Sequence, residues 1–164
     1  MKMIISWALI VLLAYTAQTS LLTFLDFNGV SVNLMLLFVV SVAYIHGWKN
    51  GIAIGFAAGI LQDLTSGSFF GCATFTYMTI GLLFGKFATR VFKEQFFFPV
   101  MSAPVAAVIY FAFMTVLIYL LGYKIDLITS MQKILLPLVC YQLLFAWLVH
   151  KIVFDFDKFA ERHG

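Results

Sequence analysis

Long unbroken runs of apolar residues dominate this sequence and restrict what it can fold into. Hydrophobic residues make up 63% of the chain and charged residues only 10%. Seven acidic and ten basic side chains are too few to form the charged surface of a water-soluble globule of 164 residues. A run of about 20 apolar residues can cross the hydrocarbon core of a bilayer as a helix. The sequence therefore predicts an all-α integral membrane protein.

Six apolar segments are separated by polar or glycine-containing breaks. They cover about residues 3–22, 30–45, 51–64, 69–84, 96–121 and 130–149. We expect a polytopic bundle of six transmembrane helices in one membrane domain, residues 1–150, followed by a short cytoplasmic tail, residues 151–164. Segments two to four would each measure only about 21–24 Å as helices, less than the roughly 30 Å hydrocarbon core. Joining segments two and three into a re-entrant pair is the alternative, and it leaves four full spans.

Local signals predict where these helices begin and end. Residues 46–50 combine breaker residues with an interfacial tryptophan, which predicts a short polar loop. Pro99 and Pro104 lie near the start of the fifth segment, where helices tolerate proline best. Thr129 and Gln132 have the spacing of a capping box, which predicts that the sixth helix opens there.

The distribution of basic residues predicts the orientation in the membrane. Placing the N-terminus in the cytoplasm puts eight of the ten basic residues inside and two outside. The inside group is Lys2, Lys49, Lys86, Arg90, Lys93, Lys151, Lys158 and Arg162, and the outside pair is Lys124 and Lys133. Because cytoplasmic loops carry an excess of Lys and Arg, we expect both termini in the cytoplasm.

No residue pattern in the sequence favours catalysis. The sequence holds no phosphate-binding loop, no nucleophile with an obvious base and no cluster with metal-ligand spacing. His46, His150 and His163 are scattered, and we expect them at solvated interfacial positions. Cys72 and Cys140 lie in apolar runs, and we expect small buried side chains there. We therefore expect neither enzymatic activity nor a cofactor.

Glycine recurs every four residues through the third segment. The series runs Gly51, Gly55, Gly59, Asp63, Gly67 and Gly71, with an aspartate in one position, and Gly81 and Gly85 repeat the spacing on the fourth segment. Residues four apart are neighbours on a helix surface, so the glycines form a ridge without side chains. Such ridges let helix backbones approach closely in lipid. We predict that this series makes helix-packing or interaction contacts.

Asp63 is the one acidic residue within these glycine-rich segments. An ionisable group at mid-membrane costs about 2.5–3.5 kcal/mol on insertion scales, so it normally faces protein or water. One interpretation is a polar contact that fixes the third helix against its neighbours, with Gln62 joining a polar network, and a second is an ion-linked site. The third is that Asp63 lies at the outer interface, where it caps or solvates that end of the helix. Lys133 is the candidate cation near the outer face.

Two features of the sequence resemble those of a known protein family. They are residues 32–37, at the opening of the second segment, and the glycine series. Together with six short spans, they are similar to the MreD family of rod shape-determining proteins, with detailed similarity over about residues 32–90. The resemblance implies a non-enzymatic adaptor of the cell-elongation machinery in the bacterial cytoplasmic (inner) membrane, with a role in peptidoglycan synthesis. It also implies binding to an MreC-type bitopic protein and indirect links to MreB, RodA and a class B penicillin-binding protein.

Two other functional classes remain open. The substrate-binding subunit of an energy-coupling-factor vitamin transporter is also a six-helix protein of this size. Such subunits often carry an Ala-x-x-x-Ala motif on the first helix, a spacing that Ala8, Ala14 and Ala17 do not have. A lipid or ion transporter is the third class, and Asp63 is its only support.

Overall fold

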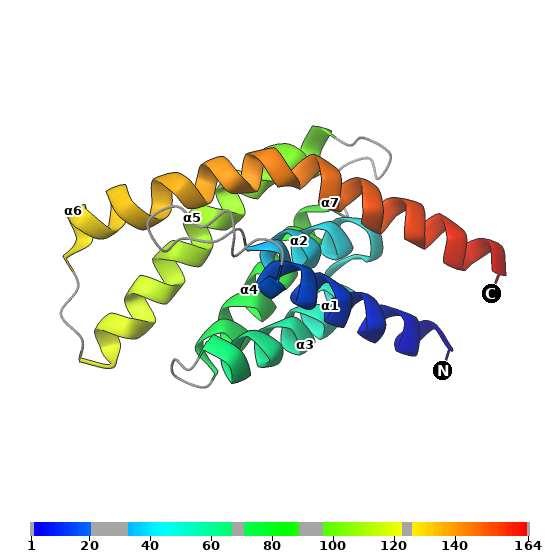
Figure 1. The fold of residues 1–164 in the computed structure, drawn as a ribbon, viewed down its shortest axis with the longest axis horizontal. Coiled ribbons are helices and arrows are strands. Elements are labelled where there is room, and N and C mark those ends of the chain that lie inside the picture. The colour runs from blue at the N-terminus through cyan, green and yellow to red at the C-terminus, as the bar shows by residue number, and fades with distance from the viewer. Residues whose placement is uncertain (1, 21–32, 67–70, 89–96, 123–125, 164) are drawn as a thin grey trace.

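The computed structural model describes residues 2–20, 33–66, 71–88, 97–122 and 126–163. These ranges contain helices and short connections and no strand, which confirms the all-α prediction. Figure 1 shows the long helices of residues 97–120 and 136–163 crossing beside the shorter helices of residues 2–88.

Each predicted apolar segment corresponds to one helical segment. The helices are α1 (Lys2–Ser20), α2 (Leu34–His46), α3 (Trp48–Ser66), α4 (Cys72–Ala88), α5 (Phe97–Leu120), α6 (Leu127–Ser130), the π-helical stretch η2 (Met131–Leu135) and α7 (Leu136–His163). The last three follow one another without a break, so they form one continuous segment.

The predicted polar loop over residues 46–50 is wrong, because a single residue separates α2 from α3. Gly47 has φ 81°, a left-handed conformation that glycine adopts without steric cost. One such residue is enough to reverse the chain. Trp48, Lys49 and Asn50 consequently form the first turn of α3.

Both predicted ends of the sixth helix are also wrong. The segment begins at Leu127, and Thr129 Oγ1 donates a hydrogen bond to Asp126 Oδ2 at 2.8 Å instead of forming a capping box. At the other end, α7 continues to His163, because no glycine or proline follows Pro137 before that point. The predicted tail is therefore largely helical in its backbone. Pro104 lies inside α5 and not in its first turn.

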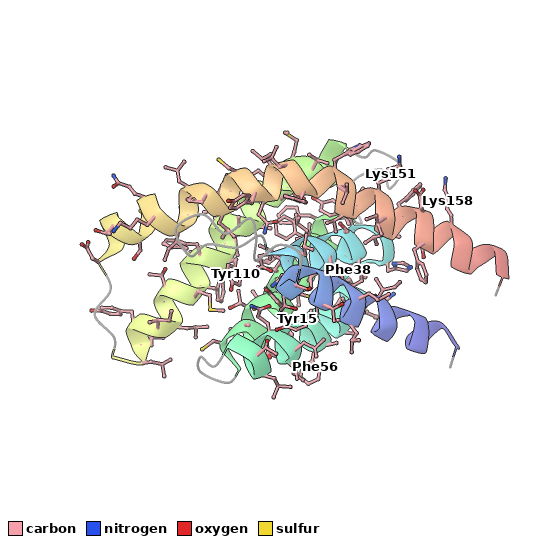
Figure 2. The ribbon with its side chains drawn as sticks, viewed as in Figure 1. Tyr15, Phe38, Phe56, Tyr110, Lys151 and Lys158 are labelled. Carbon is pink, nitrogen blue, oxygen red and sulfur yellow. The ribbon has the colours of Figure 1, made fainter. Side chains whose placement is uncertain are left out.

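Helix α2 is the centre of the fold. Nine consecutive residues, Met35 to Ala43, are buried, and α2 packs against α1, α3, α4, α5 and α7. A helix that is apolar on all sides needs apolar surroundings, and here other helices of the protein supply them. Figure 2 shows this contrast: Phe38 of α2 lies inside the bundle and is 2% exposed, whereas Phe56 of α3 points outward and is 49% exposed.

Helices α3 and α4 form an antiparallel pair. The end of α3 meets the start of α4 where Gly59 lies against Thr74. The start of α3 meets the end of α4 where Trp48 lies against Gly85. Of all element pairs, this one has the most extensive contact.

Helices α2 and α7 run parallel. Gln142 Nε2 donates to the Asn33 carbonyl oxygen at 3.0 Å, and His46 Nε2 lies 2.9 Å from Asp157 Oδ1. The start of α1 and the end of α7 lie at the same end of the molecule (Figure 1). Successive helices therefore alternate in direction.

Two described segments are long and apolar enough to cross a membrane by length and composition. They are Val100–Leu120 and Met131–Lys158, and only 17% and 28% of their apolar windows are buried inside the protein. Helices α2 and α4 are also apolar but shorter, at 13 and 17 residues. We predict that the other apolar segments also cross the membrane, and this stays a prediction.

Candidate functional site

The glycines of α3 lie against the backbone of α4. A Cβ atom added to Gly51 would lie 2.7 Å from the Gly81 carbonyl oxygen, and one added to Gly55 would lie 2.6 Å from the Tyr77 carbonyl oxygen. Real Cβ atoms essentially never come this close to such atoms. At these positions only glycine fits without a shift of one helix against the other.

The same restriction holds from the other side of the pair. An added Cβ at Gly59 would collide with the Thr74 backbone, one at Gly81 with the Gly51 backbone, and one at Gly85 with the Trp48 backbone. The two helices thus contribute glycines to a shared contact. We call Gly51, Gly55, Gly59, Gly81 and Gly85 the glycine contact.

The predicted series changes its role beyond Gly59. Gly71 has φ 102° and an added Cβ there would meet nothing within 4 Å, so it belongs to the turn before α4 and not to the glycine contact. Gly67 lies outside the described residues. Asp63 takes the next position after Gly59 and is 3% exposed.

The Asp63 carboxylate binds the N-terminus of α4. Oδ2 accepts hydrogen bonds from Gly71 N at 2.9 Å, Thr74 N at 3.0 Å and Thr74 Oγ1 at 2.6 Å, and Oδ1 accepts one from Ala73 N at 2.9 Å. The first N–H groups of a helix lack partners within the helix and carry partial positive charge, so a carboxylate stabilises them. Among the described residues Asp63 forms no ion pair, and Lys133 is not its partner. This geometry favours the structural interpretation of Asp63.

Gln62 joins a polar chain that links three helices. Its Oε1 accepts from Gln18 Nε2 of α1 at 3.2 Å, and Gln18 Oε1 accepts from the Met35 backbone N–H at the start of α2 at 3.0 Å. The prediction that Gln62 takes part in a network is confirmed. Sequence reasoning did not single out its partner Gln18, although a glutamine within an apolar segment itself indicates a polar contact.

A second polar centre lies at Asn33. Its Oδ1 accepts from Leu36 N at 3.0 Å, which caps α2, and from the Tyr77 hydroxyl of α4 at 2.8 Å. Its carbonyl oxygen accepts from Gln142 of α7, a residue with no exposed surface. The Tyr77 ring in turn lies 5.7 Å from that of Tyr110 on α5. Sequence reasoning singled out neither Tyr77 nor Gln142.

The histidines differ from their predicted solvated positions. His150 is 4% exposed and its ring stacks at 6.5 Å on Phe154, because α7 continues as a helix and turns this position toward the bundle. His46 is half-buried, with its imidazole against Asp157. The side chain of His163 lies outside the described part of the chain.

The prediction that both cysteines are buried is wrong. Cys140 is exposed on α7, and Cys72 is half-buried at the first residue of α4. In a bilayer an apolar helix face is equally stable against lipid, so an apolar run does not imply burial in the protein. Within the described ranges no group of three His, Cys, Asp or Glu side chains could hold a metal ion.

The glycine contact predicts a sharp difference between neighbouring positions. Gly55→Leu and Gly59→Leu should each destabilise the protein by about 1–3 kcal/mol or more, because a side chain there forces the helices apart. Ile54→Leu and Ile60→Leu are matched controls on the same helix and should unfold near the parent temperature. Thermal unfolding of the purified variants in detergent measures the difference, and equal stability of all four variants would contradict the contact.

Substitution of Asp63 tests the cap. Asp63→Asn keeps one acceptor oxygen but turns an N–H donor toward one backbone N–H group, so we expect a loss of about 1.5–3 kcal/mol. Asp63→Leu removes every acceptor and should cost clearly more. Asp155→Asn, at an exposed position, is the control and should change little. Unfolding in denaturant ranks the three variants, and a cap role fails if Asp63→Leu is as stable as Asp155→Asn.

Comparison with known proteins agrees with this architecture. The sequence model of one family, described as rod shape-determining protein MreD, matches residues 1–159. No curated protein and no solved structure matches the chain. The match spans nearly the whole sequence, including the glycine contact and Asp63, and so the chain belongs to the MreD family of rod shape-determining proteins.

Proposed function

We propose that this protein is a non-enzymatic, multi-pass adaptor of the cell-elongation machinery in the inner membrane. Family membership makes it a bacterial rod shape-determining membrane protein of the MreBCD system. The finer assignment is that it binds an MreC-type bitopic protein. Through that partner it would act indirectly with MreB, RodA and a class B penicillin-binding protein in peptidoglycan synthesis.

The surface of the two long helices carries this proposal. Because only 17% and 28% of the apolar windows of α5 and α7 are buried, most of their apolar side chains are at least partly exposed. Large exposed side chains recur along both helices, including Val105, Val108 and Val116 on α5 and Leu144 and Leu148 on α7. A surface of this kind is compatible with lipid and with the membrane helix of a single-pass partner. The described residues of this surface include no group of side chains that could hold a metal ion.

Six crossings with both termini in the cytoplasm fit the alternating helix directions. The α2–α3 turn, with Lys49, lies near the last part of α7, where His46 meets Asp157. Lys151 and Lys158 are on that same part of α7 (Figure 2). Three of the basic residues assigned to the inside, Lys49, Lys151 and Lys158, therefore lie toward the same end of the molecule, which supports this orientation.

Cysteine labelling in intact cells tests this topology. In a background with Cys72→Ala and Cys140→Ala, an impermeant thiol reagent should label Asp126→Cys, which is predicted to be outside. Lys158→Cys should become labelled only after the cells are opened. Both positions are exposed, so access to the reagent depends on the side of the membrane. Labelling of Lys158→Cys but not of Asp126→Cys in intact cells would reverse the orientation.

Co-purification and cell shape test the adaptor role together. The full chain, purified in mild detergent, should retain an MreC-type single-pass protein, and its depletion should round rod-shaped cells. Asp63→Asn should keep the partner and restore rod shape substantially, because most of the cap remains. Asp63→Leu should lose both.

Vitamin uptake separates the adaptor from the transporter subunit. Under the adaptor proposal, depletion changes cell shape and leaves uptake unchanged. Normal shape combined with lost uptake of one vitamin would replace the adaptor by the vitamin-binding subunit.

A further inference from the structure

A cavity opens at the end of the molecule where α2 turns into α3. Its volume is about 290 Å³, close to the lower limit of roughly 300 Å³ that is usual for ligand pockets. It is lined by the turn itself and by the last residue of α4, namely Tyr44, His46, Gly47, Trp48, Lys49, Asn50 and Ala88. The backbone of Trp48 also lies against Gly85 of the glycine contact, and none of these residues takes part in the Asp63 cap.

The backbone of the turn leaves hydrogen-bond donors at this cavity. Gly47 precedes α3 and has no side chain that could cap the helix, while Gly51 N already donates to the Gly47 carbonyl oxygen at 3.0 Å. The Trp48 backbone nitrogen lies against Gly85 of α4, whereas the hydrogen bonds of the described residues give the N–H groups of Lys49 and Asn50 no acceptor. An added Cβ at Gly47 would meet nothing within 4 Å, so the space beside the turn is open.

The side chains around the cavity favour an anion. Lys49 is exposed, and its Nζ lies 5.6 Å from the centre of the Trp48 ring, which holds the ammonium group beside the turn. Asn50, which carries an amide, and Tyr44, which carries a hydroxyl, are among the lining residues. The carboxylate that contacts this lining within the described ranges is Asp157, and His46 Nε2 holds it at 2.9 Å.

The position of the cavity identifies the source of the anion. Trp48 is 40% exposed, and Trp and Tyr side chains at a helix end are typical of the membrane–water interface. At this depth the abundant anions are the phosphates of lipid headgroups, which attract Lys and Arg. We propose that the cavity binds the phosphate of an anionic phospholipid headgroup, with the side chains and backbone N–H groups of Lys49 and Asn50 as donors. This inference depends on the membrane location of the protein and not on its partner.

Native mass spectrometry of the full chain in detergent tests the proposal. Phosphatidylglycerol is the anionic probe and phosphatidylcholine the zwitterionic one, and the protein should retain the anionic lipid preferentially. Lys49→Gln should weaken binding of phosphatidylglycerol about fivefold, the effect of one lysine near an anionic headgroup. Lys49→Arg should keep the binding. Asn50→Leu, which removes a donor without a change in charge, should weaken it as well.

Lys151→Gln is the matched control. Lys151 Nζ also lies over a tryptophan ring, 5.2 Å from the centre of Trp147, but it is not part of the cavity lining. This control should bind phosphatidylglycerol as the parent chain does. An equal loss in Lys49→Gln and Lys151→Gln would overturn the site and leave only a general attraction to basic residues.

Two further outcomes would also overturn the proposal. Unchanged lipid binding in both Lys49→Gln and Asn50→Leu would show that the cavity does not hold the headgroup. Displacement of the lipid by millimolar inorganic phosphate would assign the cavity to a soluble phosphate ligand. If Lys49→Gln does not accumulate as folded protein, the comparison of Asn50→Leu with the parent chain decides the question.

Discussion

The direct backbone contact between α3 and α4 determines how the rest of this protein packs. Gly51, Gly55 and Gly59 on one helix and Gly81 and Gly85 on the other leave no room for a Cβ atom. In a membrane the hydrophobic effect does not drive helices together, so this close approach has to supply packing energy. Helix α2, with nine consecutive buried residues, contacts both helices of the pair.

Polar side chains complete the ends of these helices where water is scarce. Asp63 serves the start of α4, Asn33 and Gln18 serve the start of α2, and each accepts hydrogen bonds from backbone N–H groups. An unsatisfied N–H group in hydrocarbon costs several kcal/mol, so such partners permit short helices such as α2 to begin inside the bundle. Since the partners come from different helices, the same bonds also fix how α1, α2, α3 and α4 lie relative to one another.

A tightly packed group of short helices beside two long, outward-facing ones suits a protein that holds others in place. The buried side chains of Asp63, Asn33, Gln18 and Gln142 form structural hydrogen bonds, and the carboxylate of Asp63 accepts four of them. The long helices α5 and α7 present apolar surface instead. The α2–α3 turn differs from this apolar surface, because its hydrogen-bond donors lie at a polar cavity near the end of the molecule. Partner contact and headgroup contact would thus use separate surfaces.

The sequence by itself determined the class of protein, the six apolar segments and the spacing of Gly51, Gly55 and Gly59, because hydropathy and a four-residue repeat are properties of contiguous chain. It predicted helix ends poorly, since a one-residue reversal at Gly47 and an uninterrupted α7 depend on backbone conformation. Only the tertiary structure decided that Asp63 caps a neighbouring helix, that His150 is buried and that a cavity opens at Gly47. These features join residues from helices that meet in space, and the order of residues along one helix does not specify which neighbour it will meet.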